Sequence, residues 1–151
     1  MIWHHPSGLY DQNSFYKTFV KDISTAKHRV IIESPFITNN RLNHLAPLLE
    51  RLAMKGVLVI VNTKPIEEHD VIFAKMAVDG ISRLQDIGAT VLLTSGHHRK
   101  LAVIDDDILW EGSLNILSQN DSCEIMRRIE SSQVVKETIN FLRLDRYYRV
   151  K

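Results

Sequence analysis

The sequence has one cysteine, almost no net charge and no long apolar run, and each shortage excludes a class of protein. Cys123 is the only cysteine in 151 residues, so the fold cannot rest on an internal disulfide, and a reducing compartment is expected. The formal net charge is +1, from 19 basic and 18 acidic residues, which gives no bulk attraction to nucleic acid or to an anionic membrane. A polyanion would have to be recognised at a local site.

Hydrophobic segments are short. The longest apolar stretches, such as residues 57–61, fall far below the roughly 20 residues that a membrane-spanning helix needs. Residues 1–6 lack the apolar core of a signal peptide. We therefore expect a cytoplasmic protein without a membrane span.

The composition that remains fits a globular protein. Hydrophobic residues make up 44% of the chain and charged residues 25%, enough for one sizeable core but not for two at this length. No internal repeat, linker or low-complexity segment interrupts the sequence. We predict a single domain over residues 1–151.

Apolar periodicity predicts three helices in the first ninety residues. Spacings of three and four over residues 15–23 indicate an amphipathic helix, with Ser14 as its N-cap. A second stripe over residues 42–52 contains Pro47, so this helix either starts near the proline or kinks there. A third stripe, with Ile72 as its first member, ends at a glycine at position 88.

Strand-like segments separate these helices and then follow one another. The predicted strands cover residues 28–33, 57–61, 90–94, 101–104, 108–110 and 124–129, and a last helix contains residues 134–142. Crossover helices force the first strands to be parallel, whereas a turn at residues 105–107 makes the later pair an antiparallel hairpin. The predicted fold class is α/β, a mixed sheet with helices on both faces, which is an α/β/α sandwich.

The polar residues of segment 98–115 are not randomly placed. On a strand, side chains two positions apart point to the same face, so His98 and Lys100 project together. Asp105 is seven residues from His98 and faces the other way. His98 and Lys100 therefore form a pair to which Asp105 does not belong.

The predicted hairpin brings further polar groups back to this pair. By residue count, Gly112 and Ser113 return to the neighbourhood of His98, and Gly112 permits a close backbone approach. Ser113 adds a hydroxyl and Asn115 adds an amide. Such a set suits an anionic oxygen held beside an imidazole that acts as nucleophile or acid. The expected anion is a phosphate.

The spacing of these residues resembles the signature of the phospholipase D superfamily. Four residues separate Lys100 from Asp105, and six separate Asp105 from Gly112. The positions that match the signature are His98, Lys100, Asp105, Gly112, Ser113 and Asn115. Residues 32–37 are similar to the family's first strand and following turn, and Glu124 stands where the family places an acidic residue after the asparagine. A signature of this length is far more specific than a three-residue motif.

The resemblance implies a two-step displacement at phosphorus. His98 would form a covalent phosphohistidine, and a second copy of the same histidine would act as general acid and then as base for water. Lys100 and Asn115, with Ser113 nearby, would hold the non-bridging oxygens of the phosphate.

Three further residues receive supporting roles. The resemblance implies that Glu124 accepts a hydrogen bond from the second ring nitrogen of His98 and that Asp105 holds the motif in place. His97 points to the opposite face and is expected to be structural or a peripheral phosphate contact. No cofactor or metal is needed. A metal cluster of His97, His98 and residues 105–107 is the alternative, but these acids lie in a turn without the usual ligand spacing.

One motif cannot supply two histidines, so the resemblance implies a homodimer formed through the active-site face. Small single-motif chains resemble the bacterial endonuclease branch of the superfamily, which favours nucleic acid as the substrate, DNA over RNA. A fused or associated DNA-processing domain is a further expected partner. The sequence does not distinguish single-stranded from double-stranded substrates and indicates no base preference.

Two alternatives stay open. One is a phospholipase or phosphatidyl transferase that acts on lipids with the same active-site chemistry. The other is a non-catalytic DNA-binding module of a larger helicase or restriction system.

Overall fold

The computed structural model describes residues 7–118 and 121–149. In chain order its elements are β1 (Ser7–Asp11), α1 (Phe15–Ser24), β2 (Arg29–Glu33), α2 (Asn39–Met54), β3 (Leu58–Thr63), η1 (Ile66–Glu68), α3 (Val71–Asp86), β4 (Thr90–Leu93), β5 (Leu101–Ile104), β6 (Ile108–Gly112), β7 (Ile125–Glu130), α4 (Ser132–Leu142) and η2 (Leu144–Tyr147). The elements η1 and η2 are short 3₁₀ helices.

Seven strands form one mixed sheet in the order β1-β7-β6-β5-β2-β3-β4. The strands β2, β3 and β4 are parallel because α2 and α3 carry the chain back between them. The strands β5, β6, β7 and β1 pair antiparallel, and β5 and β6 form the hairpin that the turn at residues 105–107 predicted. The prediction of a mixed sheet is confirmed.

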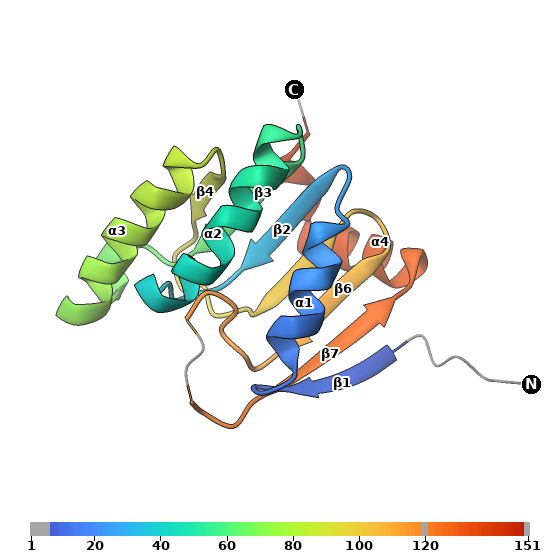
Figure 1. Cartoon of the computed structure of the whole chain (residues 1–151), viewed down its shortest axis with the longest axis horizontal. Coiled ribbons are helices and arrows are strands. Elements are labelled where there is room, and N and C mark those ends of the chain that lie inside the picture. Colours follow the sequence, from blue (N-terminus) through green and yellow to red (C-terminus); the bar gives the residue numbers. More distant parts are fainter. Residues whose placement is uncertain (1–6, 119–120, 150–151) are drawn as a thin grey trace, which may run out of the picture.

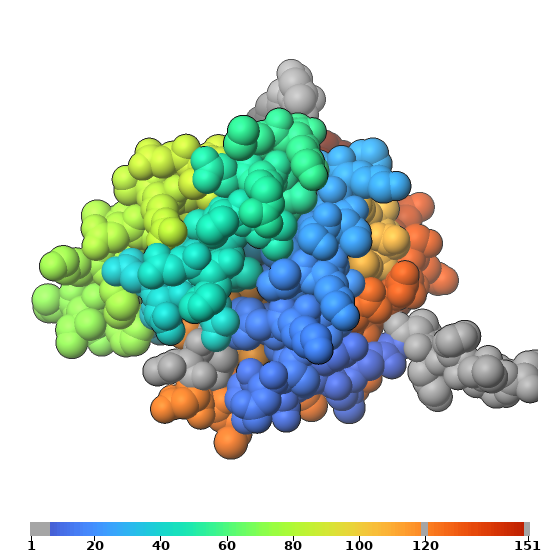
Figure 2. All heavy atoms as spheres, viewed as in Figure 1, coloured from blue at the N-terminus to red at the C-terminus, as the bar shows by residue number. Residues whose placement is uncertain are grey.

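Helices cover both faces of this sheet, which confirms the predicted fold class. Figure 1 shows α1, α2 and α3 on the near face and α4 behind the strands. Alternate residues of β2 divide between the two cores: Val30 and Ile32 pack under the first three helices, and Ile31 packs under α4. In the space-filling view, α1 and α2 hide the middle of the sheet (Figure 2).

The predicted helices and strands exist, but several details differ. The helix that contains Pro47 begins at Asn39 and runs through the proline to Met54, so Pro47 does not start it. Ser14 stands at the N-cap of α1 but makes no side-chain capping bond, because its hydroxyl bonds to Asp11 instead. Ile72 is exposed at the start of α3 and does not belong to its buried stripe.

Sequence periodicity did not predict β1. This strand pairs only with β7 in the described part of the sheet, where Gly8 faces Arg128 and Tyr10 faces Met126. At an edge, one side of a strand stays unpaired and its side chains are only partly covered, so alternation is weak over five residues.

A largely buried ion pair joins α1 to the antiparallel strands β6 and β7. Arg128 Nε and Nη2 donate to the two carboxylate oxygens of Asp22 at 2.7 and 2.9 Å, and the indole Nε1 of Trp110 donates to the same carboxylate at 2.8 Å. Hydrogen bonding to Asp22 is the main reason that the pKa of Arg128 is raised. Trp110 is fully buried.

The topology gathers several loops at one edge of the sheet. The parallel strands β2, β3 and β4 all end there, and the antiparallel β5 begins there, with Leu101 opposite Glu33. The end of β6 and the start of β7 meet at the same edge, because Gly112 lies opposite Met126. The segments that precede β5 and follow β6 are therefore neighbours.

None of the helices within residues 7–118 and 121–149 is both long enough and apolar enough to cross a lipid bilayer.

Candidate active site

His98 and Lys100 lie together in the segment that leads into β5. The ammonium Nζ of Lys100 is 3.0 Å from Nδ1 and 3.3 Å from Nε2 of the His98 ring, and it donates to the His98 carbonyl oxygen at 2.8 Å. The two residues precede the strand instead of belonging to it, which corrects the expectation of a strand position. Their side chains nevertheless share one side, as predicted from their spacing.

The electrostatic setting of Lys100 combines burial with a nearby acid. Partial burial lowers the pKa of Lys100, and the negative charge of Glu124 opposes this effect. His98 is exposed to solvent. An accessible imidazole next to a half-buried ammonium is suited to meeting a phosphate from solution.

The end of β6 returns to this pair as the residue count predicted. The backbone N–H of Gly112 donates to the carbonyl oxygen of Lys100 at 3.3 Å. A Cβ on Gly112 would lie 2.9 Å from Met126 Cα and still closer to the Ile125 carbonyl oxygen, so no larger residue fits without moving β7. The glycine is required here for close packing of two strands.

Ser113 and Asn115 follow at the same edge. Within the described residues, the hydroxyl of Ser113 is hydrogen-bonded, whereas the amide oxygen of Asn115 is not. The Ser113 hydroxyl accepts from the backbone N–H of Ile125 at 3.0 Å, and the Ser113 N–H donates to the Ile125 carbonyl at 2.9 Å, so this serine joins β6 to β7. The Oδ1 atom of Asn115 is buried and has no partner among the described residues. An amide oxygen only accepts hydrogen bonds, so contact with a phosphate oxygen would have to come from the Nδ2 group of Asn115.

Glu124 lies near Lys100 but does not contact His98. Its carboxylate accepts from the Ser122 hydroxyl at 3.1 Å, and its backbone N–H donates to Gln12 Oε1 at 2.9 Å. Between Glu124 and His98, both of which are described, no hydrogen bond is formed. The predicted bond that would orient the His98 ring is therefore not seen in this structure.

Asp105 lies at the other end of β5, away from the pair. Its carboxylate accepts from the backbone N–H groups of Lys27 (3.0 Å), His28 (2.8 Å) and Arg29 (3.1 Å). Burial alone would raise the pKa of Asp105, but these bonds outweigh it and the pKa is lowered. Asp105 thus fastens the turn after β5 to the start of β2.

Replacement of Asp105 by asparagine should destabilise the fold in a pH-dependent way. The folded-state pKa lies below the unfolded value of about 3.9, so the ionised carboxylate stabilises the fold above about pH 4 and this contribution disappears as pH falls through the folded pKa. We expect Asp105→Asn to lower the free energy of unfolding by about 1–3 kcal/mol at pH 7. Asparagine also tolerates the left-handed backbone, φ 51°, at this position.

Urea unfolding of the Asp105→Asn variant and of the wild type at pH 7 and pH 3 measures this effect. The difference between the two proteins should shrink at pH 3. Asp107→Asn is the matched control, since Asp107 is an exposed acid in the same turn. An equal difference at both pH values would contradict the assignment.

The sequence did not single out a buried charged group directly beneath the pair. Glu33, at the end of β2, is fully buried and accepts two bonds from the Arg99 guanidinium, at 3.0 and 2.9 Å. This bonding is the main reason that the pKa of Arg99 is raised. His97 is also buried, and its Nε2 lies 3.4 Å from Glu33. Of the two roles predicted for His97, its burial fits the structural one.

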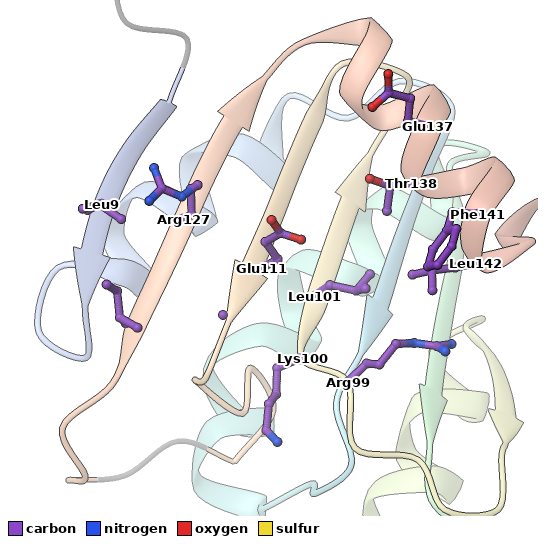
Figure 3. A pocket seen from close by; sticks show the side chains of 12 residues that line it. Leu9, Arg99, Lys100, Leu101, Glu111, Arg127, Glu137, Thr138, Phe141 and Leu142 are labelled. Atoms are coloured by element: carbon purple, nitrogen blue, oxygen red, sulfur yellow. The ribbon is translucent and has the colours of Figure 1, made fainter.

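A groove of about 940 Å³ opens beside the pair on the α4 face of the sheet. Figure 3 shows Lys100 at its lower rim, Leu101 and Glu111 on its floor, and Phe141 on its α4 side. Three of its apolar residues are strongly exposed: Leu9 (59%), Ile125 (54%) and Phe141 (87%). The groove is therefore a hydrophobic surface continuous with the candidate site.

The described residues contain no group of three or more His, Cys, Asp or Glu arranged to hold a metal ion. The charges available at this edge come from Lys100, Arg99 and the acids next to them.

Comparison with known proteins gives a family match over most of the chain. The family model described as "Cardiolipin synthase, PLD-like domain" matches residues 19–144, which include all six positions of the motif. No curated protein sequence matches the chain significantly.

Solved structures share the fold at low sequence identity. NucT from Helicobacter pylori is similar with a TM-score of 0.71 and 18% identity, over 89% of this chain and 91% of NucT. Nuc from Salmonella typhimurium, a phospholipase D family member, is similar with a TM-score of 0.73 and 14% identity, over 93% and 94% of the two chains. A phosphatidylserine synthase from Haemophilus influenzae is similar with a TM-score of 0.61 and 12% identity, but over 95% of this chain and only 38% of the synthase.

Proposed function

This chain belongs to the family of phospholipase-D-like domains, and from that premise we propose that it is a metal-independent phosphodiesterase that cleaves nucleic acid, DNA in preference to RNA. The observation that carries the proposal is that the motif residues other than Asp105 gather at one sheet edge. His98 and Lys100 lie 3.0 Å apart there, and the Gly112 N–H bonds to the Lys100 carbonyl. An imidazole nucleophile and a fixed cation are thus within reach of one phosphate.

The proposed reaction proceeds in two displacements at phosphorus. A ring nitrogen of His98 uses its lone pair to form an N–P bond while the P–O bond to the leaving group breaks. The leaving oxygen takes a proton from the partner subunit's His98. Water then attacks phosphorus and gives its proton back to that imidazole, the N–P bond breaks, and both histidines return to their starting states.

Charge on the transferred phosphoryl group is balanced by side chains. Lys100 and the amide of Asn115 bind the non-bridging oxygens, where charge develops in the transition state. Ser113, at the junction of β6 and β7, supports this binding of the phosphate. The Glu124 carboxylate opposes loss of the proton from Lys100, and we assign to it in addition the orientation of His98 in the loaded site.

The proposed reaction uses two histidines at one site, so it requires a second copy of the chain. The groove beside Lys100 supports this proposal, since Leu9, Ile125 and Phe141 expose apolar surface that a subunit interface would cover. A two-fold contact through this face would bring Lys100 and His98 of both subunits toward the axis. We therefore propose a homodimer through the active-site face, with the adjoining groove on the α4 side as part of the interface.

Nucleic acid is favoured as the substrate by the size and motif count of the chain. Single-motif chains of this length resemble the endonuclease branch, and Nuc and NucT match over nearly their whole lengths. A phospholipid is the second candidate. The apolar groove beside Lys100 favours it, because acyl chains need such a surface next to the phosphate site.

Plasmid cleavage in excess EDTA tests the proposal. Wild-type protein should nick and linearise supercoiled plasmid at the same rate with and without the chelator, and it should release no product from a short-chain phospholipid. Cleavage that stops in EDTA would contradict the metal-independent mechanism. Hydrolysis of the phospholipid without plasmid cleavage would replace the nuclease with the lipid enzyme.

A further inference from the structure

Glu33 is a fully buried carboxylate at the end of β2, directly under the segment that contains His98 and Lys100. Such a charge is costly to bury unless it is paired and hydrogen-bonded. Here Arg99 donates through Nε at 3.0 Å and Nη2 at 2.9 Å, and Asn62 Nδ2 donates at 2.8 Å. The imidazole Nε2 of His97 lies 3.4 Å away. Three side chains from two segments thus converge on one carboxylate.

The direction of side chains alternates along segment 97–100. His97 and Arg99 turn inward to Glu33, whereas His98 and Lys100 turn outward and contact each other. Figure 3 shows Arg99 and Lys100 leaving the start of β5 in different directions. Because consecutive residues of an extended chain face opposite ways, fixing positions 97 and 99 also fixes positions 98 and 100.

The segment has little regular structure of its own to hold it. Residues 94–100 lie between β4 and β5 and belong to neither strand. Its first residue, Thr94, donates through its hydroxyl to Asn62 Oδ1 at 2.8 Å, and Asn62 in turn bonds to Glu33. The Gly96 N–H donates to Glu68 Oε1 at 2.8 Å. Both ends of the segment are therefore anchored to the pair formed by Glu33 and Asn62.

We propose that Glu33 is a positioning residue for the reaction: its bidentate bond to Arg99 orients the segment so that His98 and Lys100 face the phosphate together. The inference rests on the proposed function for its kinetic test. A bidentate pair between a guanidinium and a carboxylate fixes orientation as well as distance, which a lysine at position 99 would not reproduce. The Arg99 side chain is 40% exposed, and an ion pair that reaches solvent adds little net stability, so orientation is the benefit that explains this one.

Replacement of Glu33 by glutamine is the direct test. The isosteric amide keeps the shape but removes the charge and one of the acceptors for Arg99. We expect Glu33→Gln to lower kcat for plasmid cleavage by about 10- to 100-fold, with KM within about twofold, because misplaced reacting groups slow the chemical step more than they weaken binding. Arg99→Lys keeps the positive charge without the fork and should lower kcat by a smaller factor. The Arg99→Lys variant also tests the proposal if the Glu33→Gln variant fails to fold.

Asp22→Asn is the matched control. Asp22 forms an ion pair of the same kind with Arg128, at 2.7 and 2.9 Å, but no residue of segment 94–100 bonds to it. We expect this variant to lose stability to urea and to keep the kcat of the wild type. An unchanged kcat in Glu33→Gln, or an equal loss of kcat in Asp22→Asn, would overturn the positioning role.

A second readout separates this inference from the proposed function. Without substrate, the ring-proton chemical shifts of His98 should change in Glu33→Gln and in Arg99→Lys, whereas those of His44, an exposed residue of α2, should not. A wild-type protein that cleaves no phosphodiester would refute the proposed function and leave this structural readout intact. Unchanged His98 shifts in both variants would refute the positioning role whatever the activity.

Discussion

Replacing His98 by alanine is expected to lower the rate of phosphodiester cleavage by at least about 10³-fold. Alanine removes the nucleophile from one half of the shared site and the general acid from the other, because each subunit supplies the same residue in both roles. Lys100 and Asn115 can still bind phosphate, so affinity for DNA should fall far less than kcat. Plasmid nicking under single-turnover conditions, together with a DNA-binding titration, measures the two effects separately.

His44→Ala is the control for this variant. His44 lies exposed on α2, where its Nδ1 is 2.8 Å from the Asn40 carbonyl oxygen, and it is not one of the motif residues. Its variant should cleave at the wild-type rate. A His98→Ala protein that folds normally and retains more than about a tenth of the activity would contradict nucleophilic catalysis by His98.

A charge placed on the exposed face of α4 is expected to abolish activity from a distance. Phe141 is 87% exposed and lines the groove beside Lys100. Phe141→Glu would bury a carboxylate in the proposed subunit interface, so the protein should become monomeric. Each site would then lack its general acid, which contributes about 10²- to 10⁴-fold. Light scattering after size exclusion, measured alongside plasmid nicking, follows both quantities.

Val71→Glu provides the matched substitution on α3, on the other face of the sheet. Val71 is as exposed as Phe141, at 88%, so both variants remove a similar solvent-exposed apolar side chain. We expect Val71→Glu to remain dimeric and active. A monomeric Phe141→Glu protein with full activity would show that one motif suffices for the reaction.

Subunit mixing gives a second view of the same interface. When an equal amount of His98→Ala protein is added to a fixed amount of wild type and allowed to exchange, random pairing leaves about half of the wild-type subunits in wild-type dimers. Activity should therefore fall to about half. Independent active sites would leave it unchanged.

Much of the fold followed from periodicity because its signals are local. The apolar run at residues 57–61 and the glycines after α2 and α3 mark a buried strand and two helix ends within a few residues. The strand β1 escaped prediction because its partner, β7, is more than a hundred residues away and edge pairing leaves little alternation. Helix α2 extends through Pro47 because packing on the sheet outweighs the loss of one backbone bond.

The residues of the candidate site were likewise predictable from the sequence only in part. Fixed spacing predicted His98, Lys100 and Asn115 as site residues. The residue count of the hairpin predicted that Gly112 returns to the neighbourhood of His98, and Gly112 bonds to Lys100 there. Glu33 could not be found in this way, because its partners Arg99 and Asn62 come from different segments that only the sheet brings together. A charged residue at the end of an otherwise apolar strand is the one local signal that could have pointed to Glu33.

The proposed mechanism requires His98 to become covalently attached to the substrate phosphate. Its most direct test is to quench wild-type protein during plasmid cleavage under alkaline denaturing conditions, which preserve phosphohistidine, and to search the digested protein by mass spectrometry. We expect a phosphoryl adduct on the peptide that contains His98 and none in His98→Ala. Rapid cleavage by the wild type with no adduct, or with an adduct on another residue, would contradict the mechanism.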